Sequence, residues 1–461
     1  MSRSVNGPRA GAGGGTATGT GARAGGATAA AAGAERRTVL GAGAGGGEEI
    51  TGAVTRVLRD FWSGRGAVLL LDDFDHRATS LVDELRACGA RVGAVIARTG
   101  PAAGAPEVER SLHCSDAGLD FTRPEFEAWL RDPSDDVRTW LDGLDPAREW
   151  LALGTPRTGI DTFCGRPVHG WRRPEWAAVE DKTTIDALWA AAGVPSPPHV
   201  VVTVDEPPAG PAGLDAVTGP DGVVVAADST RGHVGDSSGL RWVLEPAGVP
   251  HAVREFAGRA DRVRIARFAD GVPCSVLGMA LPDGVAVFSP IEIVTLGDPA
   301  TGRLLFCGSS THWRPGDVAE RDIRGAARRA GTELVRTTGY RGIFSVDGLL
   351  TPDGFTATEL NPRHASGLGL RAALPDFPVY LYNRAVQEGL PGLGGITAAA
   401  LEGLVRRLVA AAPSASLTVG PTLVEAVPPA PDHRAGPACA DLAARLGEPG
   451  LRAFPLAAAS D

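Results

Sequence analysis

The sequence is nearly without lysine: Lys and Arg together number 45, and Lys182 is the single lysine. A genome rich in G and C explains this economically, because it replaces Lys codons by Arg codons and also favours Ala and Gly. A lysine that persists in such a sequence is more often chemically required, since arginine carries the same charge in a different shape. Lys182 is therefore a candidate functional residue.

Patterns that would place the chain outside the cytoplasm, in a membrane or around zinc are also missing. The six cysteines are scattered, with no C-x-x-C pair and no His cluster at metal spacing, so we expect reduced, mostly buried thiols. No apolar run reaches the length of a signal peptide or the ~20 residues of a membrane span. We therefore expect a cytoplasmic protein.

Positive charge is scarce as well, with 54 acidic residues against 45 basic ones and a net charge of -9. This balance disfavours nucleic acid and anionic membranes as partners, because both attract basic patches. Small-molecule partners are expected, and the sequence leaves open whether the chain forms a homodimer.

The composition that is present is typical of a globular protein, with 43% hydrophobic and 21% charged residues. A length of 461 residues allows two to four domains. Residues 1–50 are dominated by Gly, Ala and Thr and are expected to be disordered, because they offer too few side chains to bury.

The pattern after this tail predicts an α/β protein in several parts. AVLLLDDFD, TSLVDELRACG and RVGAVIA read as strand, helix and strand of a parallel βαβ unit in an open α/β domain, 65–175. Segment 176–260 opens with a helix and continues with β-branched strands, and 261–390 is rich in strands separated by DG turns. Segment 391–461 contains one amphipathic helix and a strand, and its role is not predicted.

A hairpin near residue 350 carries the sharpest chemical pattern. Asp347 lies on FSVDGLL, and Glu359 and Asn361 lie on TATELNPR after the turn TPDG. Residues two apart on a strand share a face, and the hairpin brings Asp347 beside them. Two carboxylates and an amide suit Mg²⁺ or Mn²⁺. The alternative is a surface hairpin whose polar residues simply face solvent.

This hairpin resembles the metal-binding end of the ATP-grasp superfamily. The resemblance implies a Rossmann-like domain before a small and a large ATP-grasp lobe, and it covers roughly Gly66 to Gly389. It also implies that Asp347, Glu359 and Asn361 bind the metal that bridges the ATP phosphates, and that Arg363 contacts the transferring phosphoryl group.

Two upstream segments extend the resemblance. EDKTTIDALWAAAGVPSPP resembles the entry into the small lobe, which implies that Lys182 touches a phosphate and takes part in catalysis; alone, Lys182 would read as a solvated charge in a first helical turn. STRGHVGDSSG resembles the glycine-rich lid, although most Gly and Ser clusters are only turns. The lid residues expected to contact the nucleotide are Arg231, Gly232, Gly235 and Ser237.

One departure from the family concerns the second phosphate-binding lysine, because VVVAADST offers only Ala226 and Ala227 near its place. Arg231 and Arg264 are the candidate replacements. The resemblance also places adenine on a hinge near residues 265–269, with Ala266 and Phe268 as contacts. Arg341 is either a phosphate contact or a charge at a helix end.

The function implied is an ATP-dependent ligase that activates a carboxylate as an acyl phosphate and forms a carbon–nitrogen bond, releasing ADP and phosphate. The resemblance is strongest to enzymes that join amino acids or peptides. The missing lysine keeps open a nucleotide-binding regulator without turnover, and phosphorylation or carboxylation of a small metabolite would use the same ATP site. The sequence does not identify the substrates.

Overall fold

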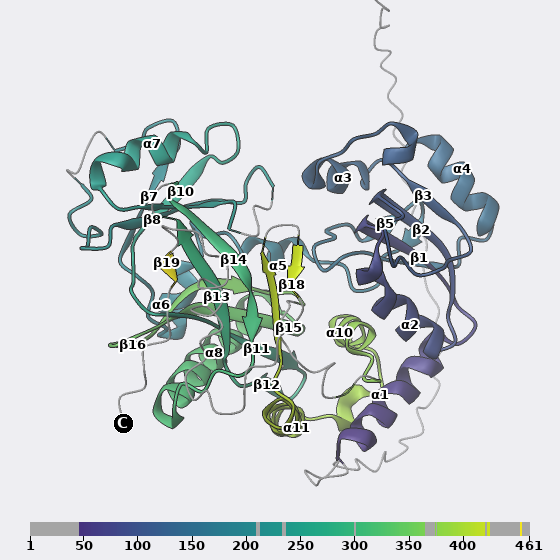
Figure 1. Ribbon diagram of the computed structural model, residues 1–461. Helices are drawn as coiled ribbons and strands as arrows, with labels where there is room; N and C mark the ends of the chain where they lie inside the picture. Colours follow the sequence, from purple (N-terminus) through teal and green to yellow (C-terminus); the bar gives the residue numbers. More distant parts are fainter. Residues whose placement is uncertain are drawn as a thin grey trace, which may run out of the picture. The chain divides into compact units, whose positions relative to one another are not determined.

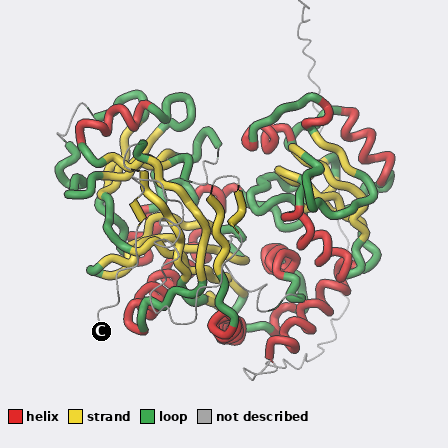
Figure 2. The backbone as a smooth tube through the Cα atoms, in the orientation of Figure 1, coloured by secondary structure: helices red, strands yellow, loops and turns green. Residues whose placement is uncertain are grey.

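The computed structural model describes residues 46–208, 213–232, 237–298, 301–364, 374, 376–419, 422–424 and 452–453. All elements below belong to the unit Val39–Asp461 (Figures 1 and 2). The expected disordered tail, 1–50, lies outside the described residues except for 46–50, which begin a helix.

This helix, α1 (Gly46–Trp62), was not predicted. Its buried side chains recur every four residues: Ile50, Val54, Leu58 and Trp62. They form one face and share a hydrophobic core with α10 (Val379–Gln387). The spacing is present in the sequence, but the Gly- and Ala-rich stretch before it hid the start of order.

The first sheet confirms the predicted parallel βαβ unit. Its order is β3-β2-β1-β4, formed by β1 (Gly66–Asp73), β2 (Arg91–Thr99), β3 (Ser111–His113) and β4 (Leu151–Leu153), and every pairing is parallel. Helix α2 (Thr79–Ala87) connects β1 to β2. Because β1 lies between β2 and β4, the strand order reverses at β1. The carboxyl ends of β1 and β4 form the edge where such sheets usually bind ligands.

Short elements complete this part of the chain. They are η1 (His76–Ala78), η2 (Ser115–Ala117), α3 (Arg123–Trp129), α4 (Asp135–Leu144), β5 (Thr162–Phe163), β6 (Arg166–Pro167) and α5 (Pro174–Ala178). Helix α3 begins with a capping box in which Thr122 and Glu125 satisfy each other's backbone amides. The segments PEFEAWLRD and DDVRTWLDGLD contain α3 and α4.

The second sheet is antiparallel and has the order β7-β10-β8-β9. Its elements and their helices are α6 (Asp186–Ala192), β7 (His199–Thr203), β8 (Val223–Ala227), β9 (Leu240–Val243), η3 (Pro246–Gly248), α7 (Val249–Arg254) and β10 (Arg262–Arg267). The predicted division between 176–260 and 261–390 comes one strand too early, because β10 pairs with both β7 and β8. Val263 and Ile265 of β10 are fully buried in this sheet's own core.

The third sheet has nine strands and carries most of the candidate site. Its order is β16-β15-β11-β13-β14-β17-β18, with β12 on β11 and β19 on β13. The strands are β11 (Val272–Leu281), β12 (Gly284–Val287), β13 (Ile291–Asp298), β14 (Arg303–Ser310), β15 (Gly342–Thr351), β16 (Gly354–Asn361), β17 (Ala415–Val419), β18 (Thr422–Val424) and β19 (Arg452–Ala453). Helix α8 (Asp317–Thr338) packs on β11, β12, β15 and β16. The buried side chains between them form a separate core.

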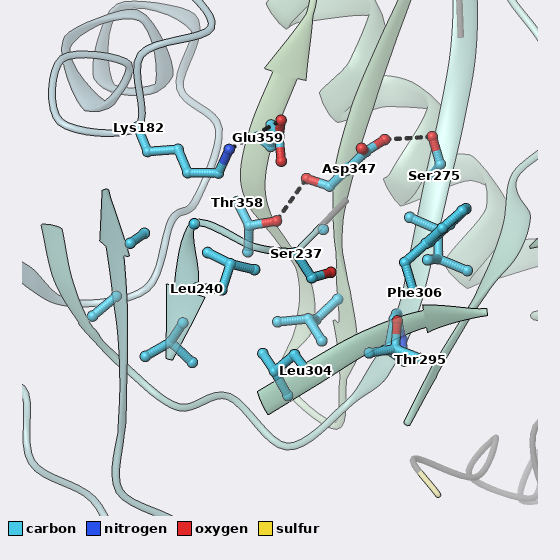
Figure 3. A pocket seen from close by; sticks show the side chains of 18 of the residues that line it. Lys182, Ser237, Leu240, Ser275, Thr295, Leu304, Phe306, Asp347, Thr358 and Glu359 are labelled. Atoms are coloured by element: carbon cyan, nitrogen blue, oxygen red, sulfur yellow. Dashed lines mark hydrogen bonds and ion pairs between the residues drawn. The ribbon is translucent and has the colours of Figure 1, made fainter. Parts of the chain in front are cut away.

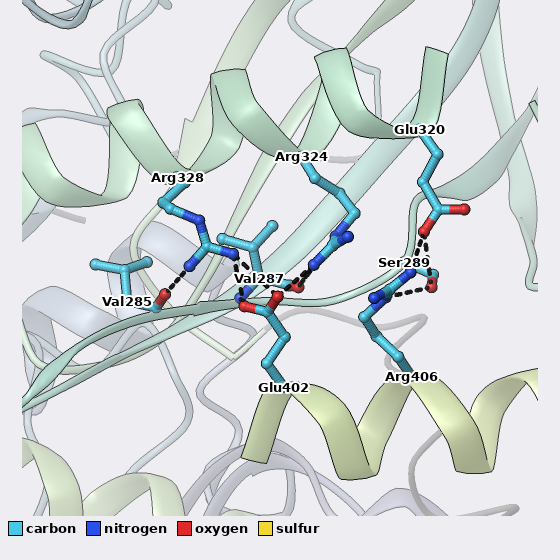
Figure 4. A network of polar contacts seen from close by, with 8 residues as sticks. All are labelled: Val285, Val287, Ser289, Glu320, Arg324, Arg328, Glu402 and Arg406. Atoms are coloured by element: carbon cyan, nitrogen blue, oxygen red, sulfur yellow. Dashed lines mark hydrogen bonds and ion pairs between the residues drawn. The ribbon is translucent and has the colours of Figure 1, made fainter. Parts of the chain in front are cut away.

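The segment 391–461 contributes to this third sheet. After η4 (Leu393–Gly395), the predicted amphipathic helix is present as α11 (Ala398–Ala411), and β17 then pairs with β14. Glu402 of α11 pairs with Arg324 and Arg328 of α8 and accepts a hydrogen bond from Val287 N (Figure 4). These contacts fasten α11 to the sheet and to α8.

Cys88, Cys114, Cys164, Cys274 and Cys307 are buried free thiols, as predicted, and Cys439 lies outside the described residues. Among the helices of the described ranges, none is long and apolar enough to cross a membrane.

Candidate active site

The hairpin β15–β16 brings the three predicted metal ligands together. Asp347 lies opposite Glu359 in the register, and Asn361 follows two residues later on the same face. The Asn361 Nδ2 donates to Asp347 Oδ2 at 3.0 Å. The condition on which the metal hypothesis depends is thus met.

Backbone geometry explains this register. The turn at Thr351–Gly354 sets the pairing, and Gly354 adopts a φ of +116° that favours glycine. A bulge follows between Asp347 and Gly348, and a Cβ at Gly348 would lie 2.3 Å from the Thr356 carbonyl oxygen. Glycine is therefore required where the strands approach each other beside the acids.

The two carboxylates form a site with an excess of negative charge. Burial raises the pKa of Asp347, and the facing Glu359 carboxylate raises it further. Ser275 of β11, which lies opposite Asp347, donates its hydroxyl to Asp347 Oδ1 at 2.5 Å. Lys182 Nζ lies 3.1 Å from Glu359 Oε1 and offsets part of the charge (Figure 3).

This donor set fits a hard divalent cation. Two carboxylates and one amide provide oxygen ligands and leave positions for water and phosphate oxygens. The Asn361 oxygen already accepts from Arg363 Nη2 at 2.8 Å, so it would have to be shared or the amide turned to face a cation. No cluster of three or more His, Cys, Asp and Glu side chains suited to a metal occurs in the described part of the chain.

Lys182 is held in a turn before α6 and not in the helix itself. Asp181 Oδ1 accepts hydrogen bonds from the backbone and hydroxyl of Thr183, and its Oδ2 accepts one from Ser229 N. These contacts fix the backbone on both sides of Lys182 and connect it to the start of the predicted lid. The lysine side chain is only 17% exposed, which excludes the solvated-charge alternative.

Arg363 connects the hairpin to the segment that precedes Lys182. Its Nε lies 2.9 Å from Glu180 Oε1 and its Nη2 binds the Asn361 oxygen. Glu180 also pairs with Arg172 at 2.7 Å. The guanidinium is thereby oriented beside the proposed metal ligands.

The three proposed metal ligands, Lys182 and Arg363 line a cleft of about 410 Å³ between the second and third sheets (Figure 3). Predicted residues that line it are Lys182, Ser237, Arg264, Ala266, Phe268, Asp347, Glu359, Asn361 and Arg363. Gly235 lies outside the described residues. Among those described, Arg231, Gly232 and Arg341 do not line this cleft.

The two candidates for the missing lysine lie in different surroundings. Arg231 is half exposed and pairs with Asp261 at 2.8 Å, so its guanidinium is held on the surface. Arg264 of β10 lies directly opposite Ala226 of β8, and both line the cleft. Of the two candidates, only Arg264 lines this cleft, and its guanidinium donates two hydrogen bonds to Asp186.

Two further expectations are corrected in their details. Arg341 is exposed on the connection between α8 and β15, with its Nη1 beside Gly389. Gly232 has a φ of +120° and lies close to Pro124 of the first part of the chain. Contacts with segments far away in the sequence place both residues, and a local sequence pattern does not predict such contacts.

The predicted hinge is the connection from β10 to β11. Ala266 and Phe268 line the cleft, but Phe268 N donates to Gly222 O and its ring stacks on Trp242 at 5.1 Å. A nucleotide base at this hinge would therefore use other backbone groups of the segment.

Sequence reasoning missed several groups in the cleft. Arg157 reaches it from the loop after β4, at the carboxyl edge where the strand order reverses. Glu292 does not line the cleft: it is 1% exposed and lies on the opposite face of β13 from Ile291 and Ile293. The reversal of strand order at β1 indicates that the loop after β4, which carries Arg157, lies at a ligand-binding edge. This reversal is known only once the pairing of the strands is known.

Comparisons with known proteins give structural likenesses alone. No protein-family model matches the sequence, and no curated protein matches it. The carboxyaminoimidazole ribonucleotide synthase of Aspergillus clavatus, complexed with ATP, is 15% identical, with a TM-score of 0.48, over 83% of this chain and 87% of that chain.

Two further solved structures have similar scores. An L-amino acid ligase of Bacillus licheniformis is 13% identical, with a TM-score of 0.47, over 77% of this chain and 80% of that one. A biotin carboxylase of Campylobacter jejuni is 12% identical, with a TM-score of 0.47, over 72% and 73%.

Proposed function

We propose that this protein is an ATP-grasp ligase that converts a carboxylate into an acyl phosphate and joins it to an amine, releasing ADP and phosphate. The observation that carries the proposal is the arrangement of Asp347, Glu359 and Asn361 on one face, beside Lys182 and Arg363, in a cleft between two antiparallel sheets. This arrangement offers both metal ligands and cationic groups for a triphosphate.

Asp347, Glu359 and Asn361 would hold Mg²⁺ or Mn²⁺. A divalent cation held by these residues would supply positive charge that neutralises phosphate. Lys182, which now pairs with Glu359, would then be available to a phosphate oxygen. Burial and the nearby Glu359 carboxylate raise the pKa of Asp347. A cation between the two carboxylates would offset their repulsion and keep both ionised.

Arg264 and Ser237 would complete the nucleotide site from the second sheet and the lid. Arg264 projects from the central part of that sheet beside Ala226, where a lysine is expected in relatives. The bidentate contact with Asp186 orients its guanidinium toward the cleft. The base would lie against the hinge near Ala266 and Phe268.

The chain's own groups position charge in the reaction and form no covalent bond. A substrate carboxylate oxygen attacks the γ-phosphorus while the bond to the departing ADP oxygen breaks. The amine nitrogen then attacks the acyl carbon, the carbon–oxygen bond to phosphate breaks, and the amine proton is lost. Lys182 and Arg363 stabilise the negative charge that moves between these oxygens.

Product identification tests the proposal directly. Purified protein is incubated with Mg-ATP and a panel of amino acids and dipeptides, and nucleotides are separated by chromatography. We expect ADP and phosphate, and a loss of about 10² in rate or more in Glu359→Gln, because a metal ligand is removed. Release of AMP would contradict the proposed acyl phosphate.

The remaining alternatives use the same site. A regulator without turnover is disfavoured because Arg264 lies opposite Ala226, near the expected place of the missing lysine, and because Asp347, Glu359 and Asn361 lie together on the hairpin. Phosphorylation or carboxylation of a metabolite is distinguished by the product alone. The cytoplasmic location and a homodimer stay predictions.

A further inference from the structure

The lining of the cleft changes character across the third sheet. Charged groups lie on β15 and β16, where the metal ligands are. The lining residues of β13 and β14 are uncharged: Ile291, Ile293, Thr295, Leu304, Phe306 and Ser309. We call Ile291, Ile293, Leu304 and Phe306 the apolar wall.

Ile293, Leu304 and Phe306 of the apolar wall are exposed enough to contact a ligand, whereas Ile291 is only 3% exposed. Phe306 is 44% exposed and is one of only five exposed large apolar side chains in the described ranges. Leu240 of β9 lines the same end of the cleft from the second sheet (Figure 3). An apolar surface inside a concave site beside a few polar groups is typical of a small-molecule subsite.

The position of the wall leaves it outside the proposed nucleotide site. The hinge leads into β11, and the metal ligands lie on β15 and β16, so a nucleotide that spans them covers β11, β15 and β16. Strand β14 lies two strands beyond β11, which is about 10 Å at the usual strand spacing. A second molecule therefore fits over β13 and β14.

The wall begins next to the metal ligands. Ile291 lies opposite Ser275, and Ser275 lies opposite Asp347, so the three form one row across the sheet. Thr295 lies opposite Phe306, which places the aromatic ring at the outer part of the wall. A molecule whose carboxylate lies near the metal ligands can thus extend its side chain over Ile293 toward Phe306.

We propose that the apolar wall binds the aliphatic or aromatic side chain of the carboxylate substrate, while the reacting carboxylate lies at the metal ligands. This inference rests on the proposed ligase function and specifies its substrate class. The uncharged lining of β13 and β14 discriminates against acidic and basic side chains, because a charge placed there loses its hydration without a partner.

Hydroxylamine makes the test independent of the unknown amine, because it traps acyl phosphates as hydroxamates. ADP release and hydroxamate are measured with Mg-ATP and L-leucine, L-phenylalanine or 4-methylpentanoate, against L-asparagine, L-aspartate and L-lysine. L-Leucine and L-asparagine are of similar size, so they compare polarity alone. We expect kcat/KM for L-leucine to exceed that for L-asparagine at least tenfold.

Phe306→Ser identifies the residue that carries this preference. We expect kcat/KM for L-leucine to fall about tenfold while KM for Mg-ATP stays within twofold. Leu119→Ser removes an apolar side chain of comparable exposure, 40%, that does not line the cleft, and should leave both values unchanged. Melting temperatures confirm that the variants are folded.

Three results would overturn the inference: preference for a charged or polar substrate, an unchanged kcat/KM for L-leucine in Phe306→Ser, or a rise in KM for Mg-ATP. If no carboxylate gives ADP, the ligase proposal fails. The apolar wall is then tested by measuring whether amino acids bind and raise the melting temperature. In that case L-leucine, and not L-asparagine, should raise the melting temperature of wild type with Mg-ADP, and Phe306→Ser should lose the shift; equal shifts contradict the inference.

Discussion

Replacing Glu292 by glutamine should stabilise the protein at pH 8 and leave its stability nearly unchanged at pH 4. Glu292 is 1% exposed, and its Oε2 has no hydrogen-bond partner among the described residues. Burial raises the pKa of this carboxyl from 4.5 to about 7. The native state therefore holds the proton more tightly than the unfolded chain.

The sign of the effect follows from linkage. Below pH 4.5 both states are protonated, and the carboxyl contributes no pH dependence. Between pH 4.5 and about 7 the unfolded chain ionises while the native protein does not, so stability falls as pH rises. Above that range the native carboxylate is ionised too, and the loss levels off at about 3 kcal/mol, from about 1.4 kcal/mol per pH unit.

Urea unfolding followed by tryptophan fluorescence between pH 4 and pH 8 measures this difference. The free energy of unfolding of Glu292→Gln should exceed that of wild type at pH 8 by up to about 3 kcal/mol, and the difference should vanish toward pH 4. Glu292→Met, which also lacks a titrating group, should show the same pH dependence. A difference from wild type that is constant across this range would refute the reasoning.

Three further changes have defined outcomes. Gly348→Ala should destabilise the protein by about 1–3 kcal/mol in urea unfolding, because a Cβ there meets backbone 2.3 Å away. Gly143→Ala in helix α4, where a Cβ meets nothing within 4 Å, should stabilise the protein by about 0.5–1 kcal/mol. A Gly348→Ala variant as stable as wild type would contradict the packing of the hairpin. Glu402→Gln should lower the free energy of unfolding by about 1–2 kcal/mol, because it removes the carboxylate between two arginines of α8, and an unchanged value would show that this network contributes nothing. Arg264→Ala should raise KM for ATP about tenfold or more while Arg231→Ala leaves it within twofold, measured by ADP release; the reverse order would return the phosphate role to the lid arginine.

Local patterns predicted much of this fold because short-range physics decides them. Alternating and continuous apolar runs identified β1, β2 and α2, and their parallel pairing follows from strand, helix and strand in sequence. The turn between β15 and β16 brings Asp347 close to Glu359, as the sequence predicts, but the bulge beside Gly348 places the two acids directly opposite each other, and no local pattern predicts that bulge.

Long-range pairing decides what the sequence did not predict. Strand β10 joins the second sheet because it pairs with β7 and β8 from distant parts of the chain. Arg264 faces the cleft because of that pairing, and Arg231 is held away by Asp261. Neither result is encoded in a local pattern.

The groups that the sequence analysis missed in the cleft have the same origin. Arg157 and the apolar wall come from loops and strands whose own patterns are ordinary. Phe306 in particular looks like a normal strand residue until β14 is placed beside β13 and opposite β9. Specificity therefore depends on topology more than on motif.

Binding of Mn²⁺ tests the central claim most directly, because EPR detects the bound ion without any turnover. Wild type is titrated with Mn²⁺ in the presence of ADP and compared with the double variant Asp347→Asn, Glu359→Gln, and with Asp353→Asn in the exposed turn of the same hairpin. We predict a bound Mn²⁺–ADP signal for wild type and Asp353→Asn, and its loss in the double variant. Equal binding by all three proteins would contradict a metal site on this hairpin.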